Sequence, residues 1–221
     1  MNKNHLKFFK LILQNNSLLR TLQILECLNI TLYGISLEFG ATNIKNKTFS
    51  NFVTGKSKFH YTNIENNKKI NIFYSDLTKK LKIPTKKYNN VLLFNVLEHL
   101  PEYKLVFSEI YRILKKKGNF IGSVPFIYQI HGAPKDYFRF SKQFFELNLK
   151  KYGFKKIKVK PLGFGPFIAS YSLVYSYLKF IPILNQLSLL LAYILDTVIQ
   201  IFVRTNLEEI FPLGYFFSAK K

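Results

Sequence analysis

The stretch "NVLLFNVLEHLPE" (Asn90–Glu102) decides the fold. Its almost unbroken apolar run over 90–97 is typical of a strand that is buried on both faces, and such strands belong to parallel sheets. A helix follows at once, because Pro101 stands where a first-turn proline is tolerated and apolar residues then repeat at helical spacing. Three polar side chains stand at the junction of strand and helix: Asn95, Glu98 and His99.

The residues after this helix predict its end and the next strand. Lys115–Lys117 complement the negative carboxyl end of a helix dipole, and Gly118 fits a left-handed cap. The apolar stretch "NFIGSVPF" (Asn119–Phe126) then reads as a strand. A strand, a helix and a second strand in this order predict a right-handed crossover in a parallel sheet.

Further elements follow from periodicity. Short apolar runs predict strands at 34–43, 58–62, 70–74 and 214–220. The stretch "FKKIKVK" at 154–160 alternates apolar residues with lysine, which predicts a half-exposed strand near the edge of the sheet.

Two stretches have the pattern of helices. Residues 6–29 form the first, within an N-terminal helical segment 1–33, and Ser17 is a candidate N-cap. The second is 141–154, for which we expect Gly153 to end the helix. With the elements above, these helices predict one α/β domain over 1–221.

The composition restricts the function classes. The chain has 221 residues, with 33 Lys and Arg against 12 Asp and Glu, and a net charge of +21. Such a charge suits nucleic acid, an anionic membrane surface or acidic substrates. However, nearly all the basic residues are lysines, and lysine can be the default residue at solvated positions. A nucleic-acid-binding protein would be expected to use more arginine to contact bases, so nucleic acid is disfavoured as a partner. The single cysteine, Cys27, excludes an internal disulfide and a Cys-rich metal site. No signal peptide is evident, so we expect a cytoplasmic protein.

An apolar helical insertion is predicted at 166–210. Its most apolar part, Leu187–Val203, is near the lower limit for a membrane span, roughly 17–25 residues. Asp196 in its middle would be costly in lipid. We therefore expect a pair of helices that serve as a lid or a homodimer face, with peripheral membrane contact as the second interpretation and a true span as the third.

Two motifs carry a family resemblance. The stretch "YNNVLLFNVLEHLPEYKLVFSEIYRILKKKGNFIGSVPF" (Tyr88–Phe126) resembles the middle of class I S-adenosylmethionine-dependent methyltransferases of the small-molecule, methyltransferase type 11-like family. The stretch "HGAPKDYFRF" (His131–Phe140) resembles a signature of a subgroup. The resemblance covers roughly residues 34–165. It implies an α/β, Rossmann-like fold: a mostly parallel seven-stranded sheet of order 3-2-1-4-5-7-6 with helices on both faces and the insertion 166–210 before the last strand.

The resemblance also implies S-adenosylmethionine as the cofactor. In "LEFGATN" the acid and the first glycine of the family's first motif are present, while its later glycines are replaced. The family's ribose acid aligns with an asparagine, and its adenine-facing acid aligns with an aspartate that could equally cap a turn. The implied cofactor-binding residues are Glu38, Gly40, Asn63, Asp76 and Asn95.

The second motif supplies candidate catalytic residues. His131 could accept a proton from the acceptor, and Asp136 could orient His131 or form an ion pair with Arg139. Arg139 could hold a carboxylate or phosphate of the substrate, or the pair could simply fix the fold. Glu98 and His99, at the end of the strand over 90–97, are expected to orient the loop that follows that strand by hydrogen bonds. A metal site formed with His131 has no ligand spacing to support it, so no metal is predicted.

The predicted function is S-adenosylmethionine-dependent methyl transfer to a small-molecule, sugar or lipid-linked acceptor, with in-line attack assisted by His131. The incomplete glycine-rich motif motivates an alternative, a catalytically inactive methyltransferase-like binding or scaffold protein. A nucleic-acid methyltransferase is disfavoured because the chain lacks a target motif such as Asn-Pro-Pro-Tyr.

Overall fold

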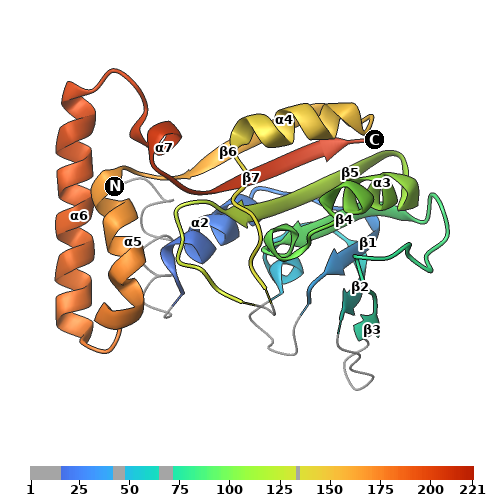
Figure 1. Ribbon diagram of the computed structural model, residues 1–221, viewed down its shortest axis with the longest axis horizontal. Helices are drawn as coiled ribbons and strands as arrows, with labels where there is room; N and C mark the ends of the chain where they lie inside the picture. The colour runs from blue at the N-terminus through green and yellow to red at the C-terminus, as the bar shows by residue number, and fades with distance from the viewer. Residues whose placement is uncertain (1–15, 42–47, 65–71, 133–134) are drawn as a thin grey trace. The chain divides into compact units, whose positions relative to one another are not determined.

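The strands of the chain form one sheet. The computed structural model describes residues 16–41, 48–64, 72–132 and 135–221. Within them the strand order is β3-β2-β1-β4-β5-β7-β6 (Figure 1). The strands are β1 (Gly34–Phe39), β2 (Ser57–Asn63), β3 (Ile72–Tyr74), β4 (Tyr88–Phe94), β5 (Leu114–Pro125), β6 (Lys155–Gly163) and β7 (Pro212–Lys220). This order confirms the sheet predicted from the resemblance.

Helices connect the strands and form the insertion. The α-helices are α2 (Leu18–Cys27), α3 (Tyr103–Ile113), α4 (Lys142–Lys151), α5 (Pro166–Leu178), α6 (Pro182–Phe202) and α7 (Leu207–Ile210). Two short 3-10 helices, η1 (Phe49–Phe52) and η3 (Leu97–His99), follow the ends of β1 and β4. Residues 6–15 of the predicted first helix and 70–71 of a predicted strand lie outside the described residues.

The chain divides into two compact units. The first comprises 1–25, 125–130 and 161–215, and holds the helices α5 to α7. The second comprises 26–124, 131–160 and 216–221, and holds the strands β1 to β4 with the helices α3 and α4. The candidate site residues all belong to the second unit.

Parallel pairing brings the carboxyl ends of the strands to one edge. The strand β1 pairs in parallel with β2 and β4, and Phe39 lies opposite Thr62 and Leu93. The strand β4 pairs in parallel with β5, where Phe94 lies opposite Ser123. The loops that follow these strands therefore begin close together, which is where open α/β sheets bind their ligands.

The end of α3 differs from the prediction. The helix stops at Ile113 because Leu114 already pairs with Tyr88 in the sheet, so the three lysines belong to β5 rather than to the helix end. The left-handed residue is Lys117, with φ 64°, and not Gly118. Glycine is still required at 118, since a Cβ there would lie 2.8 Å from the carbonyl oxygen of Lys115.

The predicted cap at Ser17 and the predicted helix end at Gly153 are confirmed, and Ser141 caps the second helix. Ser17 accepts the N–H of Arg20 at 3.4 Å, and Ser141 accepts the N–H of Phe144 at 3.3 Å. Gly153 follows α4 with φ 88°, which is a conformation that glycine adopts without steric cost.

An aromatic cluster forms the core of the second unit. Phe107 of α3 packs on Phe120 of β5, and Phe217 of β7 packs on both Phe120 and Phe145 of α4, with ring centroids 5.0 and 4.5 Å apart. All four side chains are fully buried. Each such ring contributes roughly 1.5–3 kcal/mol through burial, so the cluster holds the sheet and both helices together.

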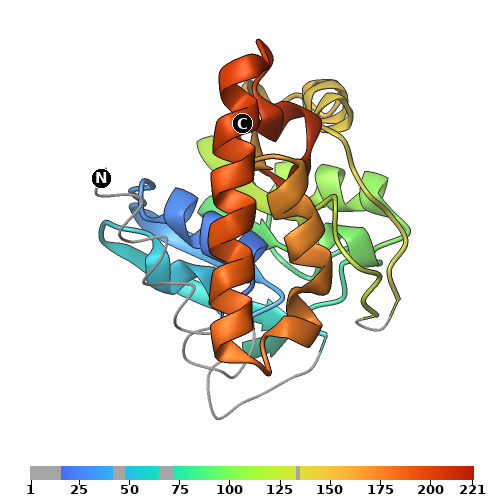
Figure 2. The same cartoon turned by 90° about the vertical axis from the view of Figure 1, so that its left-hand side faces the viewer.

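In the first unit, α5 and α6 run alongside each other as a hairpin (Figure 2). Asp196 lies in the middle of α6 and is buried. Its two carboxylate oxygens accept the N–H groups of Phe167 and Ile168, each at 2.9 Å, at the start of α5. Gly165 makes this approach possible, since a Cβ there would lie 2.6 Å from the Asp196 carboxyl. The acid that seemed costly in an apolar helix therefore caps its neighbour.

Candidate functional site

Three of the predicted cofactor-binding residues lie at the carboxyl edge of the sheet. Gly40 directly follows β1, Asn63 ends β2 and Asn95 directly follows β4. Because these strands are adjacent and parallel, the structure brings the three residues together.

Glu38 precedes this edge and faces the interior. Its carboxylate accepts the N–H of Phe49 at 2.7 Å and that of Ser50 at 2.9 Å, and the side chain is buried. Glu38 therefore anchors η1 against the end of β1. This contact accounts for an acid at this position even before any ligand is considered.

Gly40 makes the turn that follows. It adopts φ 71°, and a Cβ at this position would lie 2.5 Å from Cγ2 of Val96. Both the conformation and the space exclude a side chain here.

Asn63 and Asp76 are each tied to a loop. The Asn63 side chain donates to the carbonyl of Ala41 at 2.8 Å and so joins the ends of β1 and β2. Asp76 follows β3 and accepts the N–H and the hydroxyl of Thr78, at 2.9 and 2.6 Å. These hydrogen bonds from Thr78 are the main reason that the pKa of Asp76 lies below its ordinary value. The turn-capping alternative for Asp76 is thus realised, with one carboxylate oxygen also 3.3 Å from Lys79.

Asn95 has a backbone conformation uncommon for a residue other than glycine. Its φ is 52°, in the left-handed region that asparagine tolerates better than most residues. Its N–H donates to the carbonyl of Ser123 at 2.8 Å, so the strained residue is held between β4 and β5. Such strain is common at functional sites.

The candidate catalytic residues form a connected group. Arg139 donates to both carboxylate oxygens of Asp136, at 2.5 and 2.7 Å. Asp136 also accepts the backbone N–H of His131 at 3.0 Å and lies 3.3 Å from Nδ1 of that imidazole. The Arg139 guanidinium holds the pKa of Asp136 well below its usual range. Arg139 is therefore engaged with Asp136, which is the fold-fixing arrangement that the sequence left open.

The loop that carries these residues is fastened to η3. The carbonyl of Glu98 accepts the N–H of Tyr137 at 2.8 Å, and Nδ1 of His99 donates to the carbonyl of Lys135 at 2.7 Å. Glu98 and His99 thus position this loop. The carboxyl group of Glu98 is fully buried, and this burial raises its pKa to about 8.

The sequence did not predict how close Glu98, His99 and His131 come to one another. Among the described residues, each of the three offers one ligand atom, and these atoms all lie within 4.8 Å of one another. The rings of His99 and His131 meet edge to face, with centroids 4.9 Å apart. The cluster cannot be recognised from residue spacing, because His131 is far from Glu98 and His99 in the sequence. The segment after β5 brings His131 next to them.

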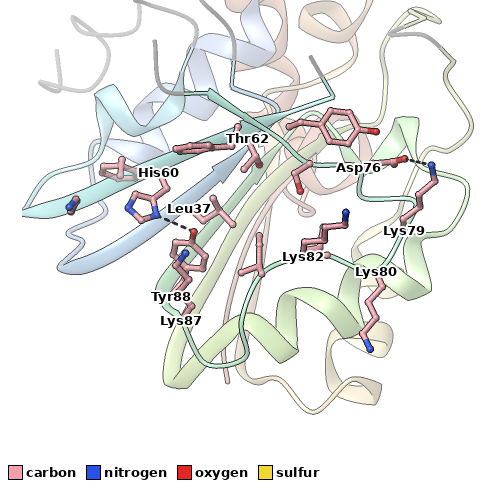
Figure 3. A pocket seen from close by; sticks show the side chains of 16 residues that line it. Leu37, His60, Thr62, Asp76, Lys79, Lys80, Lys82, Lys87 and Tyr88 are labelled. Carbon is pink, nitrogen blue, oxygen red and sulfur yellow. Dashed lines mark hydrogen bonds and ion pairs between the residues drawn. The ribbon is translucent and has the colours of Figure 1, made fainter. Parts of the chain in front are cut away.

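A cavity of about 600 Å³ lies beside β2 and β3 (Figure 3). Among the predicted site residues it includes Asp76 alone. Its other polar lining is dominated by lysines, with His60 hydrogen-bonded to the Tyr88 hydroxyl at 3.1 Å. The lysines are Lys58, Lys79, Lys80, Lys82 and Lys87. These lysines carry no distinct signal in the sequence, because they are dispersed among many solvated lysines. Such a lining suits a ligand with negative charge.

The sheet order and the glycine turn at its carboxyl edge define the fold of class I S-adenosylmethionine-dependent methyltransferases. In agreement, residues 30–122 match a family model described as a methyltransferase domain. The match covers less than half of the chain and agrees with the predicted resemblance over those residues. No curated protein matches the chain.

Solved structures share the fold at low sequence identity. Phosphoethanolamine N-methyltransferase 2 of Haemonchus contortus, in complex with S-adenosylmethionine, aligns with a TM-score of 0.55 and 16% identity over 90% of this chain. This chain spans only 52% of that enzyme's length. A methyltransferase of Thermotoga maritima aligns with a TM-score of 0.55 and 14% identity, covering 93% of this chain and 89% of that chain. A Haloferax volcanii methyltransferase in complex with the Trm112 activator aligns with a TM-score of 0.55 and 10% identity, covering 92% and 88%.

Proposed function

We propose that this chain binds S-adenosylmethionine and transfers its methyl group to a small-molecule, sugar or lipid-linked acceptor. The observation that carries the proposal is the meeting of Gly40, Asn63 and Asn95 at the carboxyl edge of the sheet. Gly40 lets the backbone approach the cofactor, and the two amides supply donors and acceptors for its polar groups.

In the proposed reaction, a nucleophilic atom of the acceptor attacks the sulfonium methyl carbon in line. The carbon–sulfur bond breaks as the new bond forms, and S-adenosylhomocysteine leaves. His131 is placed to take the acceptor's proton. Its Nδ1 faces the ionised Asp136, which favours a proton on Nδ1 and leaves the Nε2 lone pair to accept another.

Titration calorimetry with S-adenosylmethionine and S-adenosylhomocysteine tests cofactor binding. We expect wild type to bind both and Asp76→Asn to bind at least tenfold more weakly, because a charge-assisted hydrogen bond contributes roughly 1.5–3 kcal/mol. Asparagine keeps an acceptor for Thr78, so the turn at residue 76 should persist. The exposed Asn206, replaced by alanine, is the matched control and should bind as wild type does.

Absence of binding to a well-folded wild-type sample would contradict the proposal. The inactive binding or scaffold protein would then take its place. Binding of the cofactor without methyl transfer to any of a broad set of sugar, amine and lipid-linked acceptors would retain the first half of the proposal and reject the second.

We further propose that α6 contacts an anionic membrane surface. By length and composition, Pro182–Phe202 is the one helix of the described chain that could cross a membrane. Its apolar residues at helical spacing form an exposed stripe, from Ile183, 75% exposed, to Ile201, 77% exposed. The residues of this stripe are Ile183, Leu187, Leu190, Ile194, Val198 and Ile201.

The polar residues of α6 favour surface contact over a span. Asp196 caps α5, and Gln200 accepts the N–H of Leu207 at 2.9 Å, so one side of the helix is committed to the protein. Only the apolar stripe is left for lipid, as in helices that lie in the membrane interface. The net charge of +21 complements anionic lipid headgroups, which supports a membrane rather than a second copy of this chain.

Vesicle flotation tests this contact. We expect wild type to float with vesicles of phosphatidylglycerol and phosphatidylcholine, and Leu187→Gln/Ile194→Gln to bind roughly a hundredfold more weakly, since each buried aliphatic side chain contributes roughly 1.5–3 kcal/mol. Leu147→Gln on α4 is the matched control, because Leu147 is also exposed. A dimer that the double variant dissociates, with no flotation of wild type, would assign the face to self-association instead.

A further inference from the structure

We propose that Glu98, His99 and His131 bind a divalent transition-metal ion through one carboxylate and two imidazoles. The three side chains belong to η3 and to the segment that follows β5, and the structure brings one ligand atom of each within 4.8 Å of the others. Two histidines and one carboxylate are the ligand set of catalytic zinc and of non-haem iron sites, which leave a position open for substrate.

The state of the Glu98 carboxylate is the first argument. Its side chain is 0% exposed, and within the described chain neither carboxylate oxygen has a hydrogen-bond partner on another residue. A buried carboxylate without partners costs free energy unless a cation or donors compensate it. A metal ion would compensate this cost, because it would bind the carboxylate oxygens and neutralise their charge.

The orientation of His99 is the second argument. A carbonyl oxygen can only accept, so the contact between Nδ1 and the carbonyl of Lys135 places the proton on Nδ1. The lone pair is then on Nε2, which lies 3.8 Å from Oε1 of Glu98. Metal-binding histidines usually donate their other N–H to a carbonyl or carboxylate in this way.

His131 has the equivalent arrangement with a carboxylate. Its Nδ1 lies 3.3 Å from Asp136, which Arg139 holds in place by two hydrogen bonds. Both imidazoles therefore have an outer partner of the kind that metal-binding histidines have. The His131 side chain is 33% exposed, so the cluster is open to solvent on one side, where an acceptor could bind.

The three ligand atoms need to move only slightly closer together to bind one metal ion. Ligand atoms about 2.0–2.2 Å from a tetrahedral zinc ion are roughly 3.3–3.6 Å apart. His99 and Glu98 are already within a few tenths of an ångström of this separation. Rotation of the more exposed His131 ring can supply the remainder.

The metal site itself does not depend on the function proposed above, but its use in methyl transfer does. A metal at this position would take the Nε2 lone pair of His131 and lower the pKa of an acceptor hydroxyl bound to it. The hydroxyl would then release its proton to solvent instead of to the imidazole, and the oxygen would attack the sulfonium methyl carbon as before.

Cobalt(II) and zinc(II) titrations of chelator-treated protein test the site without cofactor or acceptor. We expect one cobalt ion per chain, with visible absorption bands typical of low coordination number, and its displacement by zinc. The variants Glu98→Gln and His131→Ala should each weaken binding at least tenfold. Glu98→Gln preserves the side-chain shape, and circular dichroism would verify that each variant is folded.

His60→Ala is the matched control, because His60 lies outside the cluster, where it contacts the Tyr88 hydroxyl. It should bind cobalt as wild type does. The proposal would be overturned if wild type did not bind cobalt or if Glu98→Gln bound it as tightly as wild type. Loss of cobalt binding in His60→Ala would overturn it as well. Calorimetry with S-adenosylhomocysteine in the presence of chelator measures cofactor binding separately, so failure of the metal site and failure of the proposed function are distinguishable.

Discussion

Replacement of Arg139 by alanine is expected to lower the free energy of unfolding by about 3 kcal/mol near neutral pH. Asp136 has a side chain only 2% exposed, and its carboxylate receives two hydrogen bonds from the guanidinium. Without Arg139 a buried carboxylate would lose its main partner. Urea denaturation of wild type and variant measures the difference.

The pH dependence of this difference follows from the lowered pKa of Asp136. Arg139 is the main cause of that lowering, through its hydrogen bonds. A lowered folded-state pKa stabilises the protein above the ordinary aspartate value of roughly 3.9, and the contribution is lost as pH falls through the folded-state value. We therefore expect the gap between wild type and Arg139→Ala to be full at neutral pH and to shrink on acidification.

Arg139→Lys is the matched control for this prediction. Lysine retains the positive charge but cannot donate to both carboxylate oxygens in the planar arrangement of the guanidinium. Its stability should lie between those of wild type and Arg139→Ala. Equal stability of all three proteins at neutral pH, or a gap that widens on acidification, would contradict the role given to the ion pair.

Much of the fold could be predicted because its signals are local or belong to the family motif. The apolar run of β4 and the helical repeat of α3 are visible in consecutive residues, and the caps at Ser17 and Ser141 need only a hydroxyl before an apolar pattern. The strand order came from the resemblance. The end of α3 was wrong because pairing of Leu114 with Tyr88, a tertiary contact, overrode the local preference of three lysines for a helix end.

The site was less predictable, because its chemistry depends on contacts between distant segments. The strand ends that carry Gly40, Asn63 and Asn95 meet through parallel pairing of adjacent strands, which the strand order implied by the resemblance already contains. In contrast, Asp76 is bonded to a turn, and Glu98 meets His131 only after the chain has returned from β5. The role of Asp196 as the cap of α5 was equally invisible, because its partners are 28 and 29 residues away.

Replacement of Gly40 by alanine is expected to destabilise the protein and to abolish cofactor binding. A left-handed conformation costs a residue other than glycine roughly 1–2 kcal/mol, and an overpacked contact adds roughly 1–3 kcal/mol. Both apply here, because Gly40 has φ 71° and the new Cβ would lie 2.5 Å from Cγ2 of Val96. Urea denaturation and calorimetry with S-adenosylhomocysteine measure the two effects.

The double variant Gly40→Ala/Val96→Ala separates folding from binding. Truncation of Val96 removes the overpacked contact but leaves the conformational cost, so stability relative to Val96→Ala alone should recover in part. Cofactor binding should not recover, because alanine still disfavours the left-handed turn on which the approach of the backbone to the cofactor depends. If binding returned together with stability, Gly40 would serve the turn alone and the cofactor would lie elsewhere on the carboxyl edge. A Gly40→Ala variant as stable as wild type would contradict the steric argument itself.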